Sequence, residues 1–130
     1  MNIPLLCIAL LGSLCIGTGF AVSLARAKTN RAAGHSTEPD DYLHKRVRAH
    51  GNTVEYTPVL MVIIYIVSQS QMTSWMLWFM VIATICRLLL VAGLILPPTM
   101  AKPNPMRFIG ALGTYICGFA LCAALFMQAM

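Results

Sequence analysis

The sequence predicts an all-α fold: an integral membrane bundle of four transmembrane helices in one domain that covers residues 1–130. Two observations carry this prediction. Hydrophobic residues make up 58% of the chain and charged residues only 10%, whereas a soluble domain carries about 25% charged residues. The hydrophobic residues also gather in four runs, each close to the roughly 20 residues that a helix needs to cross a bilayer.

The first run covers residues 3–25 and predicts a helix over about 3–26. A cleaved signal peptide is the alternative, because Ala25-Arg26-Ala27 loosely resembles a cleavage site. No basic residue precedes the run, however, and the run is longer than the core of a signal peptide. We therefore expect a retained helix, in which Gly12, Gly17 and Gly19 permit close packing against a neighbouring helix.

Turn and proline signals delimit the other runs. The three remaining helices are predicted over about 42–70, 74–96 and 105–129. A polar loop at 33–41 precedes the second helix, and Pro58 inside that helix removes one backbone donor. Polar residues 69–74 form a tight turn before the third helix, which ends at Pro97-Pro98 because neither proline can continue it.

Basic residues flank the apolar runs and set the predicted orientation. They lie in the first and third loop regions, and the middle turn has none: Arg26, Lys28, Arg31, Lys45, Arg46 and Arg48, then Lys102 and Arg107. Because basic loops stay in the cytoplasm, we expect both loops there and both termini on the other side. This placement explains the net charge of +5 and argues against a nucleic-acid binder, which presents a basic face.

The cysteines and histidines indicate packing rather than metal binding. The five cysteines lie in apolar runs without a CxxC pair, which is typical of small buried hydrophobic residues. His35, His44 and His50 lie on the first loop or at the start of the second helix, and we expect no metal ion there. The sequence also contains no Ser-His-Asp set, phosphate loop or paired catalytic carboxylates.

Two ionisable residues fall inside the predicted membrane spans. Glu55 lies in the second span and Arg87 in the third. With a rise of about 1.5 Å per residue, both lie about 20 Å from the middle turn. Charges inside spans usually face the bundle and pair, so the sequence predicts an ion pair between them that either locks two helices together or belongs to a site.

Polar residues share one face of the second helix. At about 100° per residue, Arg48, Asn52 and Glu55 fall within about 60° of each other, with Tyr56 beside them and His50 roughly opposite. Four such groups on a face that enters the bilayer predict a polar binding site. A zwitterionic ligand would suit it, because Arg48 can bind a carboxylate, Glu55 an ammonium and Asn52 an amide.

These residues resemble the MAPEG family, the membrane-associated proteins in eicosanoid and glutathione metabolism. The segment 48–58 matches its second-helix signature: arginine, three residues, asparagine, two residues, glutamate, and proline three further on. Weaker matches cover nearly the whole chain: Arg26, Arg87 with Gly93, and Arg107 with Gly110 and Gly113-Thr114. The likeness is to bacterial-type members, which implies a bacterial inner membrane.

The resemblance implies a homotrimer that binds glutathione in a pocket between subunits on the cytoplasmic side. Carried over, the residues that bind the tripeptide would be Arg48, Asn52, Glu55 and Tyr56, with Arg26 and His50 from the adjacent subunit and Arg87 beside them. Arg107 would be the catalytic residue, because a nearby cation favours the thiolate. Many members conjugate this thiolate to lipophilic electrophiles, and a peroxidase would use the same thiolate.

The third helix departs from the well-known enzymes of the family. Residues 87–95 contain no tyrosine, and the histidine of many bacterial relatives is also missing. The loop 97–105 is longer than in the eukaryotic enzymes, which affects the match of Arg107. Three hypotheses therefore stand: a glutathione transferase, a non-enzymatic lipid-binding or scaffolding member, and a small proton-coupled exporter with Glu55 as its coupling carboxylate.

Overall fold

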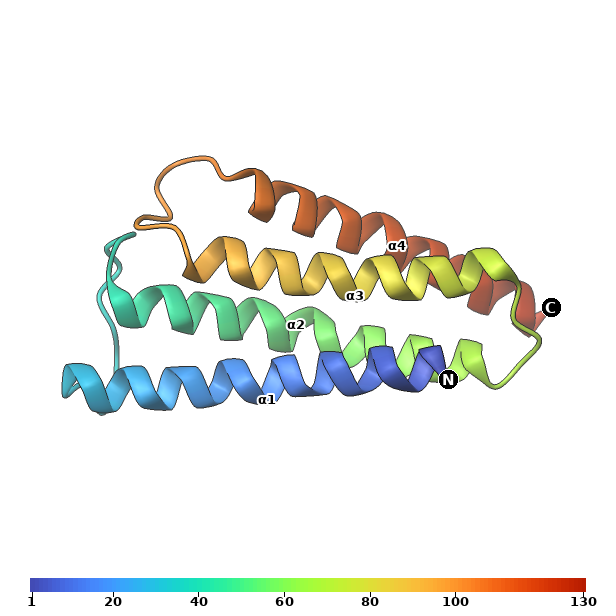
Figure 1. The fold of residues 1–130 in the computed structure, drawn as a ribbon, viewed down its shortest axis with the longest axis horizontal. Helices are drawn as coiled ribbons and strands as arrows, with labels where there is room; N and C mark the ends of the chain where they lie inside the picture. The colour runs from blue at the N-terminus through green and yellow to red at the C-terminus, as the bar shows by residue number, and fades with distance from the viewer.

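A computed structural model describes all 130 residues and contains four helices without strands. The helices are α1 (Ile3–Thr29), α2 (Tyr42–Ser68), α3 (Ser74–Ile95) and α4 (Pro105–Ala129). They run side by side as an elongated bundle (Figure 1). All four are long and apolar enough to cross a membrane. The structure thus confirms the predicted all-α class and the four membrane-spanning helices.

The helix ends lie close to those predicted and follow from their capping residues. Asp41 and Asn104 cap α2 and α4 by accepting hydrogen bonds from backbone N–H groups in the first turn, as short polar side chains do at helix starts. The prediction ended the first helix at residue 26, but α1 continues to Thr29 and closes on Asn30, whose φ is 52°. Asparagine tolerates this left-handed conformation at a helix end.

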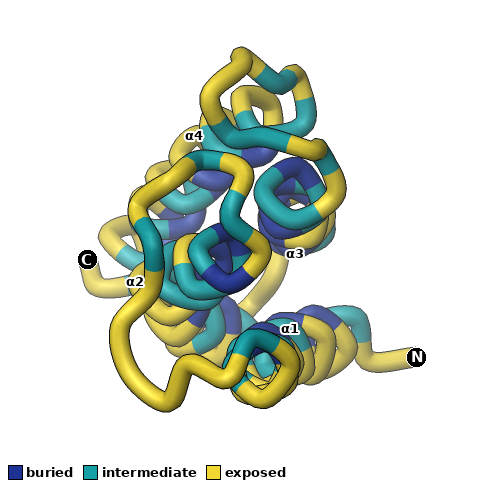
Figure 2. Tube along the Cα trace, turned by 90° about the vertical axis from the view of Figure 1, so that its left-hand side faces the viewer, coloured by how far each residue is buried: buried dark blue, intermediate teal, exposed yellow.

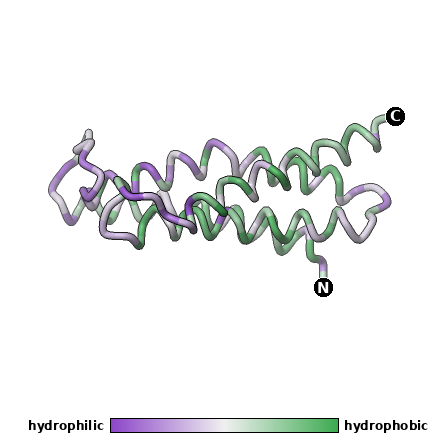
Figure 3. Tube along the Cα trace, turned by 90° about the horizontal axis from the view of Figure 1, so that it is seen from above, coloured by the Kyte–Doolittle hydropathy of each residue, from purple (hydrophilic) through white to green (hydrophobic).

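The bundle has two chemically different ends. The loops 30–41 and 96–104 lie together at one end, which we call the loop end, while both termini and the turn 69–73 lie at the other, the terminal end (Figure 1). Hydrophilic residues concentrate at the loop end (Figure 3). Viewed along the bundle, the buried parts of each helix face the other helices and the exposed parts face outward (Figure 2).

The apolar core occupies the half of the bundle beside the terminal end. Its members come from all four helices: Cys7, Leu11, Leu60, Ile64, Val67, Met76, Met80, Leu121 and Ala124. The predicted burial of the cysteines holds for Cys7, Cys86 and Cys117, whereas Cys15 and Cys122 are half-buried, and all five are free thiols. Lipid tails are as apolar as these side chains, so inside a membrane the cluster contributes to the association of the four helices through close van der Waals packing.

Hydrogen bonds tie the two loops to each other. The backbone N–H of Met100 donates to the carbonyl of Pro39 at 2.8 Å. The buried Lys45 donates through Nζ to the carbonyl of Pro97, also at 2.8 Å. Since Pro97 lies just beyond the C-terminus of α3, this ammonium satisfies a carbonyl at a helix end that favours positive charge. The start of α2 is thereby joined to the end of α3.

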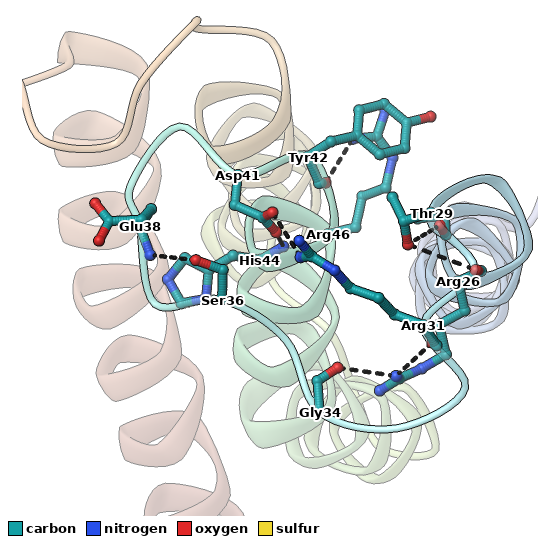
Figure 4. Close-up of polar contacts among 11 residues, drawn as sticks. Arg26, Thr29, Arg31, Gly34, Ser36, Glu38, Asp41, Tyr42, His44 and Arg46 are labelled. Carbon is teal, nitrogen blue, oxygen red and sulfur yellow. Dashed lines mark hydrogen bonds and ion pairs between the residues drawn. The ribbon is translucent and has the colours of Figure 1, made fainter.

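Polar contacts also connect residues of the first loop to one another and to the start of α2 (Figure 4). Arg31 forms an ion pair with Asp41 at 2.9 Å, and Asp41 accepts a hydrogen bond of 2.7 Å from the backbone N–H of His44. The His44 N–H and the neighbouring Arg31 hold the pKa of Asp41 below its ordinary value, because both favour the charged carboxylate. Nearby, the rings of His35 and His44 stack with centroids 5.0 Å apart.

Candidate functional site

Arg87 is the most deeply buried charged residue, with only 1% of its surface exposed. It comes from the middle of α3 and reaches α2, where its Nη2 donates to both the backbone carbonyl and the Oδ1 of Asn52, each at 2.9 Å. Its Nε has no hydrogen-bond partner. A buried donor without an acceptor is costly, so this side chain is only partly satisfied within one chain.

The predicted ion pair between Glu55 and Arg87 is wrong. The chain forms one ion pair, Arg31–Asp41 in the first loop, and Glu55 lies exposed on α2. The sequence argument matched the two residues by depth alone. The guanidinium instead binds Asn52, which lies almost one turn nearer to the start of α2 than Glu55, where a carbonyl and an amide oxygen together accept from one nitrogen.

A polar cavity of about 90 Å³ lies beside Arg87. It is lined from α2, α3 and α4 by Arg48, Asn52, Tyr56, Arg87, Leu90, Leu94, Ala111, Thr114 and Tyr115. Two guanidinium groups and the amide of Asn52 present hydrogen-bond donors there, and no lining residue is acidic. Such a donor set fits an anion, and the planar guanidinium groups suit a carboxylate in particular.

A larger apolar groove adjoins this cavity between α2 and α4. Its volume is about 330 Å³, and it is lined by Glu55, Tyr56, Val59, Leu60, Ile63, Thr114, Tyr115, Gly118, Phe119 and Cys122. Glu55 is its one charged residue. The two spaces share Tyr56, Thr114 and Tyr115, so polar and apolar environments meet at these three residues.

The two shared tyrosines contact each other across the helices. The hydroxyl groups of Tyr56 on α2 and Tyr115 on α4 are 3.1 Å apart, and their rings meet edge to face with centroids 5.6 Å apart. The guanidinium of Arg87 lies 5.4 Å from the centre of the Tyr56 ring, within cation–π range. Arg87, Tyr56 and Tyr115 thus form a continuous row from the polar cavity to the groove.

Tyr115 was missed in the sequence analysis. Tyrosines were expected on the third helix, whereas this one comes from the fourth. The available signal was depth: α2 and α4 both start at the loop end (Figure 1), so residues at similar distances from their starts can meet. Comparing Tyr56 with the polar residues of the fourth helix would have found it.

Glycines allow α4 to lie against α3 at this level. A Cβ on Gly110 would approach the backbone N of Leu90 to 2.7 Å and the carbonyl of Cys86 to 2.8 Å. A Cβ on Gly93 would reach the backbone N of Arg107 at 2.8 Å. These distances leave no room for a larger residue, and the close approach brings the Tyr115 segment of α4 beside Arg87.

Three of the predicted site residues lie away from the cavity within one chain. His50 faces α1, where its Nδ1 is 3.1 Å from the hydroxyl of Thr18. Arg26 donates to three carbonyls of the first loop, the shortest bond reaching Gly34 at 3.0 Å (Figure 4). Arg107 donates to the carbonyl of Met100 at 2.7 Å.

The remaining predicted residues come together. Arg48, Asn52, Tyr56 and Arg87 line the polar cavity, and Glu55 lines the groove next to it. The polar residues of α2 therefore share one face as expected, and the carboxylate of Glu55 lies in the apolar groove next to the polar cavity.

Comparison with known proteins agrees with this architecture. The family model described as "MAPEG family" matches residues 4–127, which is nearly the full length of the chain. No curated protein and no solved structure matches the sequence. Together with the four apolar helices, the match makes the chain an integral, multi-pass membrane protein. Its membership follows from a match over all four helices: the chain belongs to the MAPEG family.

Proposed function

We propose that this protein is a membrane-bound glutathione transferase that conjugates the glutathione thiolate to lipophilic electrophiles. The observation that carries the proposal is the pairing of a cationic cavity with an apolar groove along a shared wall. The family includes glutathione transferases and related members, and its members generally bind glutathione. A conjugating enzyme needs such an arrangement, because its two substrates have opposite polarity.

Charge complementarity supports glutathione as the polar ligand. The tripeptide carries two carboxylates and one ammonium group. A carboxylate suits the donors of Arg48, Asn52 and the unpaired Nε of Arg87, because charge-assisted bonds to guanidinium groups are the strong ones. The exposed Glu55 on the neighbouring turn suits the ammonium group.

The size of the cavity supports a site completed by a second subunit. A volume of about 90 Å³ is well below the roughly 300–1,000 Å³ of ordinary ligand pockets, so one chain encloses only part of a tripeptide. Arg26 and His50, which lie away from the cavity of their own chain, would complete the site of a neighbour. We therefore include a homotrimer in the proposal, with the loop end in the cytoplasm of a bacterial cell and the helices in its inner membrane.

The reaction follows from the thiolate. The glutathione thiol loses its proton to water, the sulfur forms a bond to an electrophilic carbon, and a leaving group such as chloride departs with its electron pair. Arg107 is the proposed catalytic residue, since a cation beside the sulfur favours the thiolate. Its Nη1 donates to the carbonyl of Met100, and the other N–H groups of the guanidinium remain available to the ligand. A lipid peroxidase would use the same thiolate.

Calorimetry with glutathione in detergent tests the binding step. We expect measurable binding that Arg48→Ala weakens by about tenfold or more, because a charge-assisted hydrogen bond contributes about 1.5–3 kcal/mol. Lys102→Ala, which removes an equal charge from an exposed site in the third loop, is the matched control. Equal affinities in the two variants would remove Arg48 from the site.

A transferase assay with a chlorinated aromatic acceptor tests the chemistry. Arg107→Ala should lower turnover and leave glutathione affinity nearly unchanged, whereas Lys102→Ala should leave both unchanged. Glutathione binding without turnover of any acceptor would favour the non-enzymatic lipid-binding member. Drug-dependent proton movement in liposomes that is lost in Glu55→Ala would favour the exporter.

A further inference from the structure

The boundary between the polar cavity and the apolar groove is where the two proposed substrates would meet. Only Tyr56, Thr114 and Tyr115 line both spaces. At these residues a tripeptide in the cationic cavity would come nearest to an electrophile in the groove. In this proposal the group that reacts, the glutathione sulfur, lies at this boundary, about two helical turns along α4 from Arg107. Arg107 would then favour the thiolate through its charge at a distance, and a second group would contact the sulfur.

The three hydroxyl groups at this boundary differ in whether their hydrogens already have an acceptor. The hydroxyl of Thr114 is already used, because it donates to the carbonyl of Gly110 at 2.7 Å. The hydroxyls of Tyr56 and Tyr115 share one hydrogen bond with each other. Two phenols carry two hydrogens, so one phenolic hydrogen remains without an acceptor in the chain.

Both neighbours of this pair also have unused donors. The Nε of Arg87, beside the Tyr56 ring, is buried without a partner, and the amide nitrogen of Asn52 makes no hydrogen bond within the chain. Unpaired donors therefore continue from the polar cavity to the boundary. A negatively charged acceptor bound next to these donors would form hydrogen bonds with them. Glutathione in its thiolate form carries negative charge and is such an acceptor.

We propose that the Tyr56–Tyr115 pair directs its free hydrogen to the glutathione sulfur through the hydroxyl of Tyr115, which makes Tyr115 a catalytic residue. This inference rests on the proposed transferase function. Tyr115 is assigned as the residue that donates to the sulfur, because its side chain is 45% exposed and open to a ligand, whereas Tyr56 is half-buried. Tyr56 then donates to Tyr115, and chains of hydrogen bonds strengthen one another.

The chemical role is stabilisation of the thiolate without proton transfer from the phenol. The thiol proton leaves to water, the phenolic hydrogen stays on the Tyr115 oxygen, and the sulfur carries the negative charge until its bond to carbon forms. When the leaving group departs with its electrons, the hydrogen bond to sulfur weakens. The pair therefore stabilises the attacking form more than the product thioether.

The test compares Tyr115→Phe and Tyr56→Phe with Tyr65→Phe, an exposed tyrosine that lines neither space. Thiolate formation on the protein is followed by ultraviolet absorbance against pH, together with kcat and KM for a chlorinated aromatic acceptor. In Tyr115→Phe we expect the pH midpoint to rise by about one unit and kcat to fall about tenfold, since one pKa unit is 1.36 kcal/mol. Glutathione KM should stay within about twofold.

The outcomes separate this inference from the function on which it rests. A midpoint and kcat in Tyr115→Phe equal to those of Tyr65→Phe would overturn the role of Tyr115 and leave the transferase proposal standing. A raised midpoint in Tyr56→Phe alone would assign the donor to Tyr56 and likewise overturn it. A smaller rise in Tyr56→Phe than in Tyr115→Phe supports the order of donation. Absence of glutathione binding by the unaltered protein would overturn both proposals.

Discussion

The two halves of the bundle treat their buried groups differently. Beside the terminal end, nine apolar residues from all four helices form one cluster. Toward the loop end, the buried set includes Lys45, Thr53 and Arg87, and the three buried polar atoms without a partner belong to His44, Thr57 and Arg87. The first half is held by apolar packing, and the second contains buried polar atoms without a hydrogen-bond partner.

This difference indicates that one half of the bundle holds the helices together and the other contains the candidate site. Close packing of apolar side chains specifies the association of the helices, while an ionisable side chain inside a membrane span, such as Arg87, is a candidate for function. Substitutions in the two halves should therefore separate stability from ligand binding. The following experiments test that separation.

Leu121→Ala in the apolar cluster should have the largest effect on stability. Leu121 is fully buried, and removing such a side chain costs about 2–5 kcal/mol through lost contacts and a residual cavity. We expect a lower unfolding midpoint in detergent with little change in glutathione affinity for the folded fraction. Leu112→Ala, at an exposed leucine of the same helix, is the control. Equal losses of stability in both variants would contradict the two-half description.

Gly110→Ala should destabilise the contact between α3 and α4. The added Cβ would meet backbone atoms of Leu90 and Cys86, which cannot move aside as a side chain can, and overpacking costs about 1–3 kcal/mol. Gly17→Ala is the matched control, because a Cβ there meets nothing within 4 Å and alanine favours a helix more than glycine does. A Gly110→Ala protein that unfolds at the same temperature as Gly17→Ala would disprove the close approach.

Arg87→Met should have the opposite effect to Leu121→Ala: lower glutathione affinity with little change in stability. Methionine removes a buried guanidinium whose Nε is unpaired but leaves the Oδ1 of Asn52 without its donor. These two effects oppose each other, so the unfolding midpoint should change little. Glutathione affinity should fall about tenfold, the equivalent of about 1.4 kcal/mol, since Nη2 no longer orients Asn52 and Nε is no longer available to the ligand. Calorimetry and thermal unfolding on the same preparation measure both. A large loss of stability with unchanged affinity would give Arg87 a purely structural role.

Acidification should loosen the first loop, with the smallest effect of the four. Because the pKa of Asp41 is lowered in the fold, its contribution is present above the unfolded value of about 3.9 and is lost as the pH falls through the folded pKa. Hydrogen exchange at the His44 amide should stay slow at the ordinary carboxyl pKa of about 3.9 and lose its protection only at lower pH. In Asp41→Ala it should be unprotected at every pH, while Asp40→Ala should match the unaltered protein. Protection that persists in Asp41→Ala would remove the capping role.

The sequence predicted the helices well because membrane spans leave a strong signal. The four apolar runs, the turn before Ser74 and the prolines after Leu96 delimit the helices to within a few residues of their observed ends. The shared face of Arg48, Asn52 and Tyr56 also followed from helical periodicity alone, since all three belong to one helix.

Contacts between helices were predicted less well. Depth placed Glu55 and Arg87 at the same level, but the direction of the guanidinium depends on which acceptors its neighbours leave free, and Asn52 offered two. The contact of Tyr115 with Tyr56 was not predicted, because the two residues lie on α4 and α2, which are not consecutive helices. A residue that reaches a neighbouring subunit, as proposed for Arg26 and His50, leaves no such signal within a single chain.

The buried bond from Lys45 to Pro97 connects the third loop to the helix that carries the polar face. Arg48 follows Lys45 by less than one turn, so a displaced loop would rotate or shift the first turns of α2 and carry Arg48 with it. If the proposed glutathione site is correct, loop length and composition would then tune the affinity for the tripeptide without any change in the residues proposed to bind it. Family members with shorter third loops should consequently differ from this chain in how their second-helix arginine is oriented.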